Sequence, residues 1–152
     1  MGHYSAAQTV REIQNFHMDT RGWSDIGYNF LINSITGKVY EGRGWTVLGA
    51  HGAGHNTEDT GVCIIGKDKA GVQDVSDAAR RSFRALYEDA KRRKGGNLKL
   101  LGHRDRGSTT CPRRRDLQLA ACRSTNRRHV AARRAEAFPR PTTGERGLAG
   151  VM

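Results

Sequence analysis

Apolar residues recur at helical spacing in two segments of this chain, and short strand-like runs lie between and after them. Residues 75–93 form the clearer helical segment, which Gly95 and Gly96 are expected to end. Its predicted buried stripe consists of Val75, Ala79, Phe83, Leu86 and Ala90. Residues 5–19 predict a second helix, with Ser5 as its N-cap. The apolar face of that helix consists of Val10, Ile13, Phe16 and His17.

Four short runs have the character of strands. Residues 28–33 and 38–41 flank turn residues and predict a hairpin. The apolar run 61–66 predicts a buried strand, and residues 98–101 predict another. The segment 42–56 is too rich in glycine to form an element with its own core, so we expect a loop whose side chains are available for binding.

Size and composition limit the class of protein. The chain has 152 residues, which fits one domain that can bury a core, and we expect a monomer. A formal net charge of +11 predicts attraction to polyanions such as nucleic acid, anionic lipid or teichoic acid. Because no apolar stretch approaches the roughly 18 residues of a membrane span and no signal-peptide pattern is visible, we expect a soluble protein made in the cytoplasm.

The three cysteines do not form the pattern of a disulfide scaffold. Reduced thiols fit an odd and sparse count better. Cys63 lies in the apolar run and is expected to be a small buried hydrophobe, and Cys122 is expected to be unpaired in a helix. Cys111 is the candidate metal ligand.

The C-terminal segment is strongly basic. A helix is expected from Leu117 to about Ala137, although its apolar face thins out beyond Cys122. We therefore expect residues 123–152 to be a solvated, flexible basic tail. The functional alternative is an electrostatic arm that binds an anionic surface.

A histidine and a cysteine with the chemistry of zinc ligands lie close together after the strand predicted at 98–101. His103 and Cys111 are eight residues apart, and zinc binds imidazole nitrogen and thiolate sulfur readily. Alone, such a pair is more often structural. A catalytic site needs a third protein ligand, and spacing does not choose among the candidates. These are His3, His17, His51, His55 and His129.

Three ordered motifs resemble one known family. The run FHMDTRGWSDIGYNFLINSITGKVYEGRGWTVLGAHGAGHN (16–56), GVCIIG (61–66) and GHRDRGSTTCP (102–112) are similar to the peptidoglycan recognition proteins and the related N-acetylmuramoyl-L-alanine amidases, including amidase-type phage lysozymes. The resemblance covers roughly residues 3–122. It implies an α/β domain with a central mixed sheet, helices on both faces, and a zinc-floored groove along one edge.

The resemblance also implies the chemistry of the site. It places the zinc ligands at His3, His103 and Cys111, with Tyr28 and Thr109 beside the metal in catalytic roles. Without a catalytic role, Tyr28 would be an aromatic residue that packs in a strand, and Thr109 would be an ordinary loop hydroxyl. Because Cys111 is present, the resemblance favours a zinc-dependent amidase that cuts between N-acetylmuramic acid and L-alanine. A non-catalytic peptidoglycan-binding module is the alternative.

The family's substrate positions can also be carried over. They fall on His17, Arg21, Gly22, Trp23, Arg43, His51 and Asn56. The combination of Gly22, Trp23 and Arg43 is associated with diaminopimelate-type stem peptides, whose extra carboxylate a guanidinium can bind. Without a role in substrate binding, Trp23 would be a core ring and Arg43 would be a solvated charge on a loop.

The chain departs from the family pattern at its start and after Cys111. Only Met1 and Gly2 precede His3, so the first strand of the domain at 1–122 is expected to be truncated. Three arginines follow Pro112 where a glycine is common, which puts positive charge near the site. The absence of a signal peptide suggests a phage endolysin that reaches the cell wall by a holin-type route. No nucleic-acid-binding motif accompanies the basic charge, so we expect no specific nucleic-acid partner.

Overall fold

The computed structural model describes residues 5–66 and 75–108. Its elements, in chain order, are α1 (Ala6–Asn15), the π-helical turn η1 (Phe16–Thr20), β1 (Phe30–Asn33), β2 (Val39–Glu41), β3 (Val62–Ile65), α2 (Asp77–Lys94) and the 3-10 turn η2 (His103–Asp105). Several expected features lie outside the described residues: His3, Thr109, Cys111, Cys122, the helix after Leu117 and the domain boundary between residues 122 and 123.

The three strands form one mixed sheet in the order β2-β1-β3. β1 and β2 are the antiparallel arms of the expected hairpin, with Leu31 opposite Tyr40. β3 lies parallel to β1 on the other side, with Leu31 opposite Cys63. A parallel pair needs a crossover connection rather than a tight turn, and the long glycine-rich loop supplies part of it. The hairpin and the strand predicted at 61–66 are confirmed.

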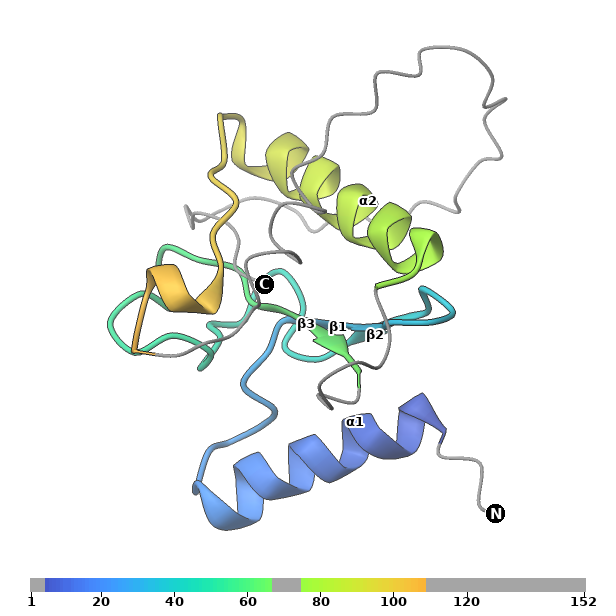
Figure 1. Cartoon of the computed structure of the whole chain (residues 1–152). Helices are drawn as coiled ribbons and strands as arrows, with labels where there is room; N and C mark the ends of the chain where they lie inside the picture. Colours follow the sequence, from blue (N-terminus) through green and yellow to red (C-terminus); the bar gives the residue numbers. More distant parts are fainter. Residues whose placement is uncertain (1–4, 67–74, 109–152) are drawn as a thin grey trace.

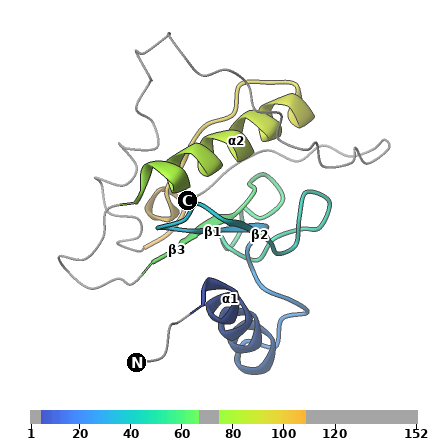
Figure 2. The ribbon, with the colours of Figure 1, turned by 90° about the vertical axis from the view of Figure 1, so that its right-hand side faces the viewer.

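Helices cover both faces of the sheet. Figure 1 shows α2 above the three strands and α1 below them, and the turned view in Figure 2 keeps the sheet between the two helices. This is the α/β architecture that the sequence predicted. No helix within residues 5–66 and 75–108 is long and apolar enough to cross a membrane.

The core lies between α2 and the sheet. Ala79 and Phe83 of α2 cluster with Phe30, Ile32 and Val62, which are the strand residues on that face. Leu31, on the alternate face, is also fully buried. The helix begins at Ser76, whose side chain accepts a hydrogen bond from the backbone N–H of Ala79. It ends at Gly95, which adopts the left-handed conformation (φ 66°) that a Cβ disfavours.

The strand predicted at Leu98–Leu101 is wrong. The structure has no strand there, and only an isolated bridge at Leu101. Leu98 is buried against Ala90 of α2, and its carbonyl accepts a hydrogen bond from the Tyr87 hydroxyl at 2.6 Å. Leu98 therefore packs on α2 instead of pairing within the sheet.

The first helix is only partly as predicted. Ser5 is its N-cap and accepts a hydrogen bond from the backbone N–H of Gln8 at 3.1 Å, as expected. The regular helix ends at Asn15, and residues 16–20 continue as a single π-helical turn. None of the described residues of α1 is buried. Such π-turns widen the helix and are frequent at functional sites.

Candidate functional site

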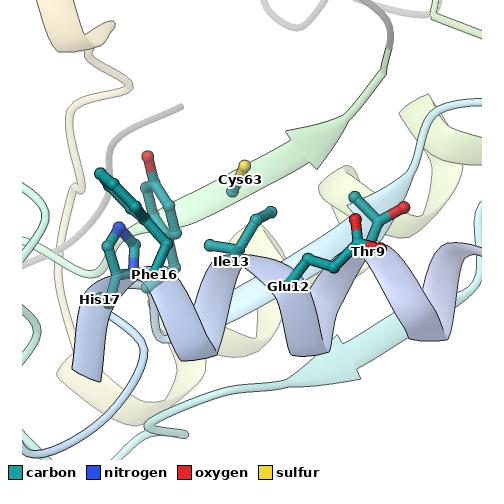
Figure 3. A pocket seen from close by; sticks show the side chains of 7 residues that line it. Thr9, Glu12, Ile13, Phe16, His17 and Cys63 are labelled. Carbon is teal, nitrogen blue, oxygen red and sulfur yellow. The ribbon is translucent and has the colours of Figure 1, made fainter. Parts of the chain in front are cut away.

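A cavity of about 410 Å³ lies between α1 and the sheet. Its α1 wall is a stripe at helical spacing, made of Thr9, Glu12, Ile13, Phe16 and His17. Figure 3 shows this stripe pointing toward β3, with the Cys63 thiol on the opposite wall. Tyr28, from the segment before β1, also lines the cavity. Cys63 is half-buried at this wall, so the expectation of a buried hydrophobe is corrected.

His17 is held in one orientation by its neighbours. Its Nδ1 accepts a hydrogen bond from the backbone N–H of Gly27 at 3.0 Å. Its ring lies 4.7 Å from the Trp23 ring and 5.9 Å from the Tyr28 ring, centroid to centroid. Burial, followed by the positive charge of Arg21, lowers the pKa of His17 below its ordinary value of 6.5. The neutral ring therefore carries its proton on Nε2, where it can donate to a ligand.

Trp23 is half-buried and packs within the site. A Cβ on Gly27 would lie 2.7 Å from the Trp23 ring, so only glycine leaves room for the indole there. Gly22 adopts a positive φ of 69°, which turns the chain from η1 toward Trp23. The Trp23 ring therefore packs beside His17 and is not part of the core beneath α2.

Arg43 is neither buried in the core nor free in solvent. Its Nε donates to the carbonyl of Ile26 at 2.7 Å. Its two terminal nitrogens donate to the carbonyls of Leu48 and Asp25, at 2.6 and 3.2 Å. These bonds tie the start of the glycine-rich loop to the turn before β1. A guanidinium has five N–H groups, so one on each terminal nitrogen remains available among the described contacts.

His51 is buried and fits only because glycines surround it. Its Nε2 lies 3.3 Å from the carbonyl oxygen of Asp59. A Cβ on Gly49 or on Gly61 would collide with the His51 ring. Burial lowers the pKa of His51 below 6.5, although the hydrogen bond with Asp59 opposes this. A positive charge on His103 also lowers the pKa of His51.

Asn29 is a site-forming residue that the sequence analysis missed. Its side-chain N–H groups donate to the carbonyls of Gly44 and Val47 at 2.8 and 2.9 Å. Its side-chain oxygen accepts the backbone N–H of Gly61 at 2.9 Å. This buried amide joins the glycine-rich loop to the residue before β3. The sequence did offer a signal, because Asn29 lies between Tyr28 and the first residue of the core strand. A side-chain amide that is buried at such a position needs hydrogen-bond partners.

The remaining expected substrate residues lie at the edges of this group. Arg21 is exposed, with its guanidinium 5.5 Å from the Phe16 ring centroid. The side-chain oxygen of Asn56 accepts the backbone N–H of Gly52 at 2.9 Å, which shapes the loop that carries His51. The structure thus brings His17, Trp23 and Tyr28 together and gives Asn56 a loop-forming role.

His103 begins η2 and is the one expected zinc ligand among the described residues. Within residues 5–66 and 75–108, no group of three or more histidines, cysteines, aspartates or glutamates could hold a metal ion. The buried Nδ1 of His51 has no hydrogen-bond partner among these residues. The nitrogen donors of His51 and His103 suit zinc by type, but a site also requires the ligands expected at positions 3 and 111.

Comparison with known proteins gives consistent relatives, although no family model matches the chain. Human N-acetylmuramoyl-L-alanine amidase is 43% identical over 109 residues, covering 70% of this chain and 18% of that protein. Peptidoglycan-recognition protein SC2 of Drosophila melanogaster is 42% identical over 106 residues, covering 68% and 55%. The chain therefore spans about half of one relative and less than a fifth of the other.

The chain also resembles a solved structure, and this match covers a larger share of the related protein. It is peptidoglycan recognition protein-LE in complex with tracheal cytotoxin, a monomeric diaminopimelic acid-type peptidoglycan. The sequence identity is 33%, the TM-score is 0.65, and the match covers 75% of this chain and 68% of that one.

Proposed function

The chain belongs to the family of peptidoglycan-recognition proteins and N-acetylmuramoyl-L-alanine amidases, and on that premise we propose that it is a zinc-dependent amidase. The bond cut is the amide between N-acetylmuramic acid and L-alanine of bacterial peptidoglycan. One observation carries this proposal: the His17 ring packs against Trp23 and Tyr28, and His17 and Tyr28 line the cavity between α1 and the sheet. The phage endolysin role expected from the sequence stays a prediction.

Zinc would be held by His103 together with His3 and Cys111. When bound, zinc would supply a water molecule with a pKa near neutrality and a positive charge that polarises a carbonyl. The chain's own groups bind and orient the substrate around it. His17 donates from Nε2 to the muramyl peptide, and the Tyr28 hydroxyl stabilises the developing oxyanion. Thr109 is proposed as a second donor at that oxyanion.

The substrate groove would run from His17 and its neighbours Trp23 and Tyr28 across the glycine-rich loop. Its proposed contacts are His17, Arg21, Gly22, Trp23, Arg43, His51 and Asn56. We infer a preference for diaminopimelate-type stem peptides. Three carbonyls fix the Arg43 guanidinium, and one N–H on each terminal nitrogen remains to donate to a carboxylate. The related protein bound to tracheal cytotoxin supports this class of ligand.

The test combines zinc content with release of stem peptide from purified diaminopimelate-type peptidoglycan. We expect about one zinc per chain and release that begins at L-alanine. Cys111→Ala should abolish both, whereas the matched variant Cys122→Ala should change neither. A folded chain at full zinc that releases nothing would contradict the amidase proposal. If that chain still bound muramyl peptide, it would be a non-catalytic binding module.

Stem-peptide preference is tested by comparing substrates. The wild type should release diaminopimelate-type peptide faster than lysine-type peptide. Arg43→Lys keeps the positive charge but loses the two-pronged geometry, so it should reduce this preference. Equal rates of the wild type on both substrates would contradict the inferred role of Arg43.

A further inference from the structure

A buried ion pair joins two segments that lie far apart in the sequence. Arg106 follows η2, and Asp59 ends the glycine-rich region before β3. The Nε of Arg106 lies 2.9 Å from Oδ2 of Asp59, and a terminal nitrogen lies 3.1 Å from Oδ1. The Asp59 side chain is 2% exposed and that of Arg106 is 24% exposed. This is a two-pronged, charge-assisted contact in a place that excludes most water.

Asp59 also touches the first of the two site histidines. Its backbone carbonyl is the partner of His51 Nε2 at 3.3 Å. Its own backbone N–H donates to the carbonyl of His55 at 3.0 Å, which closes a turn of the loop. The position of Asp59 therefore sets the position of the His51 ring, which Gly49 and Gly61 enclose on other sides.

Arg106 touches the second histidine. Its backbone N–H donates to the carbonyl of His103 at 3.2 Å. The same turn is closed at its start by Asp105, whose carboxylate accepts the backbone N–H of Gly102 at 2.7 Å. A continuous path of contacts thus runs from His51 through Asp59 and Arg106 to His103.

The contribution of this ion pair to overall stability does not by itself account for it. Replacing a buried ion pair by apolar residues is often neutral or stabilising, so such pairs are weak evidence for stability alone. An ion pair of fixed geometry also fixes the position of one segment relative to the other. Here it joins the segment that follows the short turn η2 to the residue whose carbonyl contacts His51.

We propose that Asp59 and Arg106 are positioning residues that lock η2 onto the glycine-rich loop and so hold His103 in place beside His51. This inference rests on the proposed amidase function, in which His103 binds zinc. Neither residue is one of the proposed substrate contacts or zinc ligands. Their effect is on the orientation of a ligand, and outer contacts of this kind influence metal affinity as well as activity.

The variants Arg106→Gln, Asp59→Asn and their combination test the proposal in the full-length chain. Zinc affinity, measured by competition with a chromophoric chelator well below the unfolding temperature, should fall about tenfold in each single variant. The double variant should lose little more than either one, because the two residues act as one unit. In peptide release by Arg106→Gln, kcat should fall while KM stays near the wild-type value. Arg106→Lys keeps the charge and should retain part of the zinc affinity.

The matched control is the ion pair of Arg93 and Asp89 on α2. Its Nε–Oδ2 distance is 2.8 Å, and its side chains are 21% and 28% exposed. Arg93→Gln should leave zinc affinity and kcat unchanged. Wild-type zinc affinity in Arg106→Gln and Asp59→Asn would overturn the proposal.

Amide-hydrogen exchange separates this proposal from the proposed function. Protection of the amides of residues 102–106 should fall in Arg106→Gln and remain in Arg93→Gln. If the wild type bound no zinc and released no peptide, the amidase proposal would fail. Loss of protection confined to residues 102–106 would then still support the positioning role, and unchanged protection would overturn it.

Discussion

The two faces of the sheet are built on different principles. On one face, α2 buries Ala79, Phe83 and Ala90 and forms the core with β1 and β3. On the other, none of the described α1 residues is buried, and a cavity of about 410 Å³ lies between the helix and the sheet. The α2 face therefore carries most of the packing energy. The α1 face gives up packing and keeps polar and aromatic groups accessible, as a ligand site requires.

The largest expected contrast comes from removing one phenylalanine on each face. Phe83→Ala should lower the free energy of unfolding by about 3–5 kcal/mol, because it opens a void in the core. Phe16 is 49% exposed, so Phe16→Ala should cost well under half of that. Urea denaturation measures both. Equal losses would mean that α1 packs as firmly as α2.

Gly61→Ala tests the crowding around His51. A Cβ there would collide with the His51 ring, so this substitution should cost about 1–3 kcal/mol of stability. It should also weaken muramyl-peptide binding by displacing the ring. Gly96, where a Cβ meets nothing within 4 Å, is the control position, and Gly96→Ala should leave binding unchanged. Unimpaired binding in Gly61→Ala would show that the position of His51 does not matter for the ligand.

The two helix N-caps provide a smaller and closely matched contrast. Ser5 and Ser76 each accept a backbone N–H at 3.1 Å. Ser76 also donates to the carbonyl of Ile35 at 2.7 Å. Ser76→Ala should therefore cost about 1–2 kcal/mol of global stability. Ser5→Ala should cost only about a few tenths, because α1 can fray without unfolding the core. The reverse order in urea denaturation would contradict the division between faces.

The smallest effect expected is a dependence of stability on pH. The folded-state pKa values of His17 and His51 lie below 6.5, so the unfolded chain binds more protons just below that pH. The contribution of these residues is fully present above pH 6.5 and is lost as pH falls through the folded values. His17→Gln should reduce the slope of stability against pH in this window. A slope that His17→Gln leaves unchanged would contradict the lowered pKa.

The sequence predicted the α2 face better than the α1 face. The helical period of Ala79, Phe83 and Ala90 predicted that these residues share one buried face of a helix, and the structure confirms it. The α1 stripe had the same period, yet the structure leaves it unburied at the cavity wall. Periodicity tells which residues share a face, and it does not tell whether a partner or a cavity covers that face. The strand expected at Leu98–Leu101 failed for a related reason, since a short apolar run can pack on a helix without pairing in the sheet.

Much of the candidate site could be predicted only by resemblance. The motif residues His17, Trp23 and Tyr28 do come together in space. The hydrogen bonds that shape the site were not visible, because Asn29 reaches Gly44 and Gly61 across fifteen and thirty-two residues. The Asp59–Arg106 pair spans forty-seven residues and gave no local signal. Long-range polar pairs depend on the fold, whereas a local pattern records only neighbours along an element.

The division between the two faces is tested most directly by mapping ligand contacts. A diaminopimelate-type muramyl tripeptide would be added to the zinc-supplemented, isotope-labelled chain, and backbone amide shifts would be followed by NMR. The account predicts shifts in residues 13–28 and 49–56, with residues 77–94 of α2 unaffected. Shifts concentrated on α2, with none at His17 or Tyr28, would contradict the assignment of the α1 face as the ligand site.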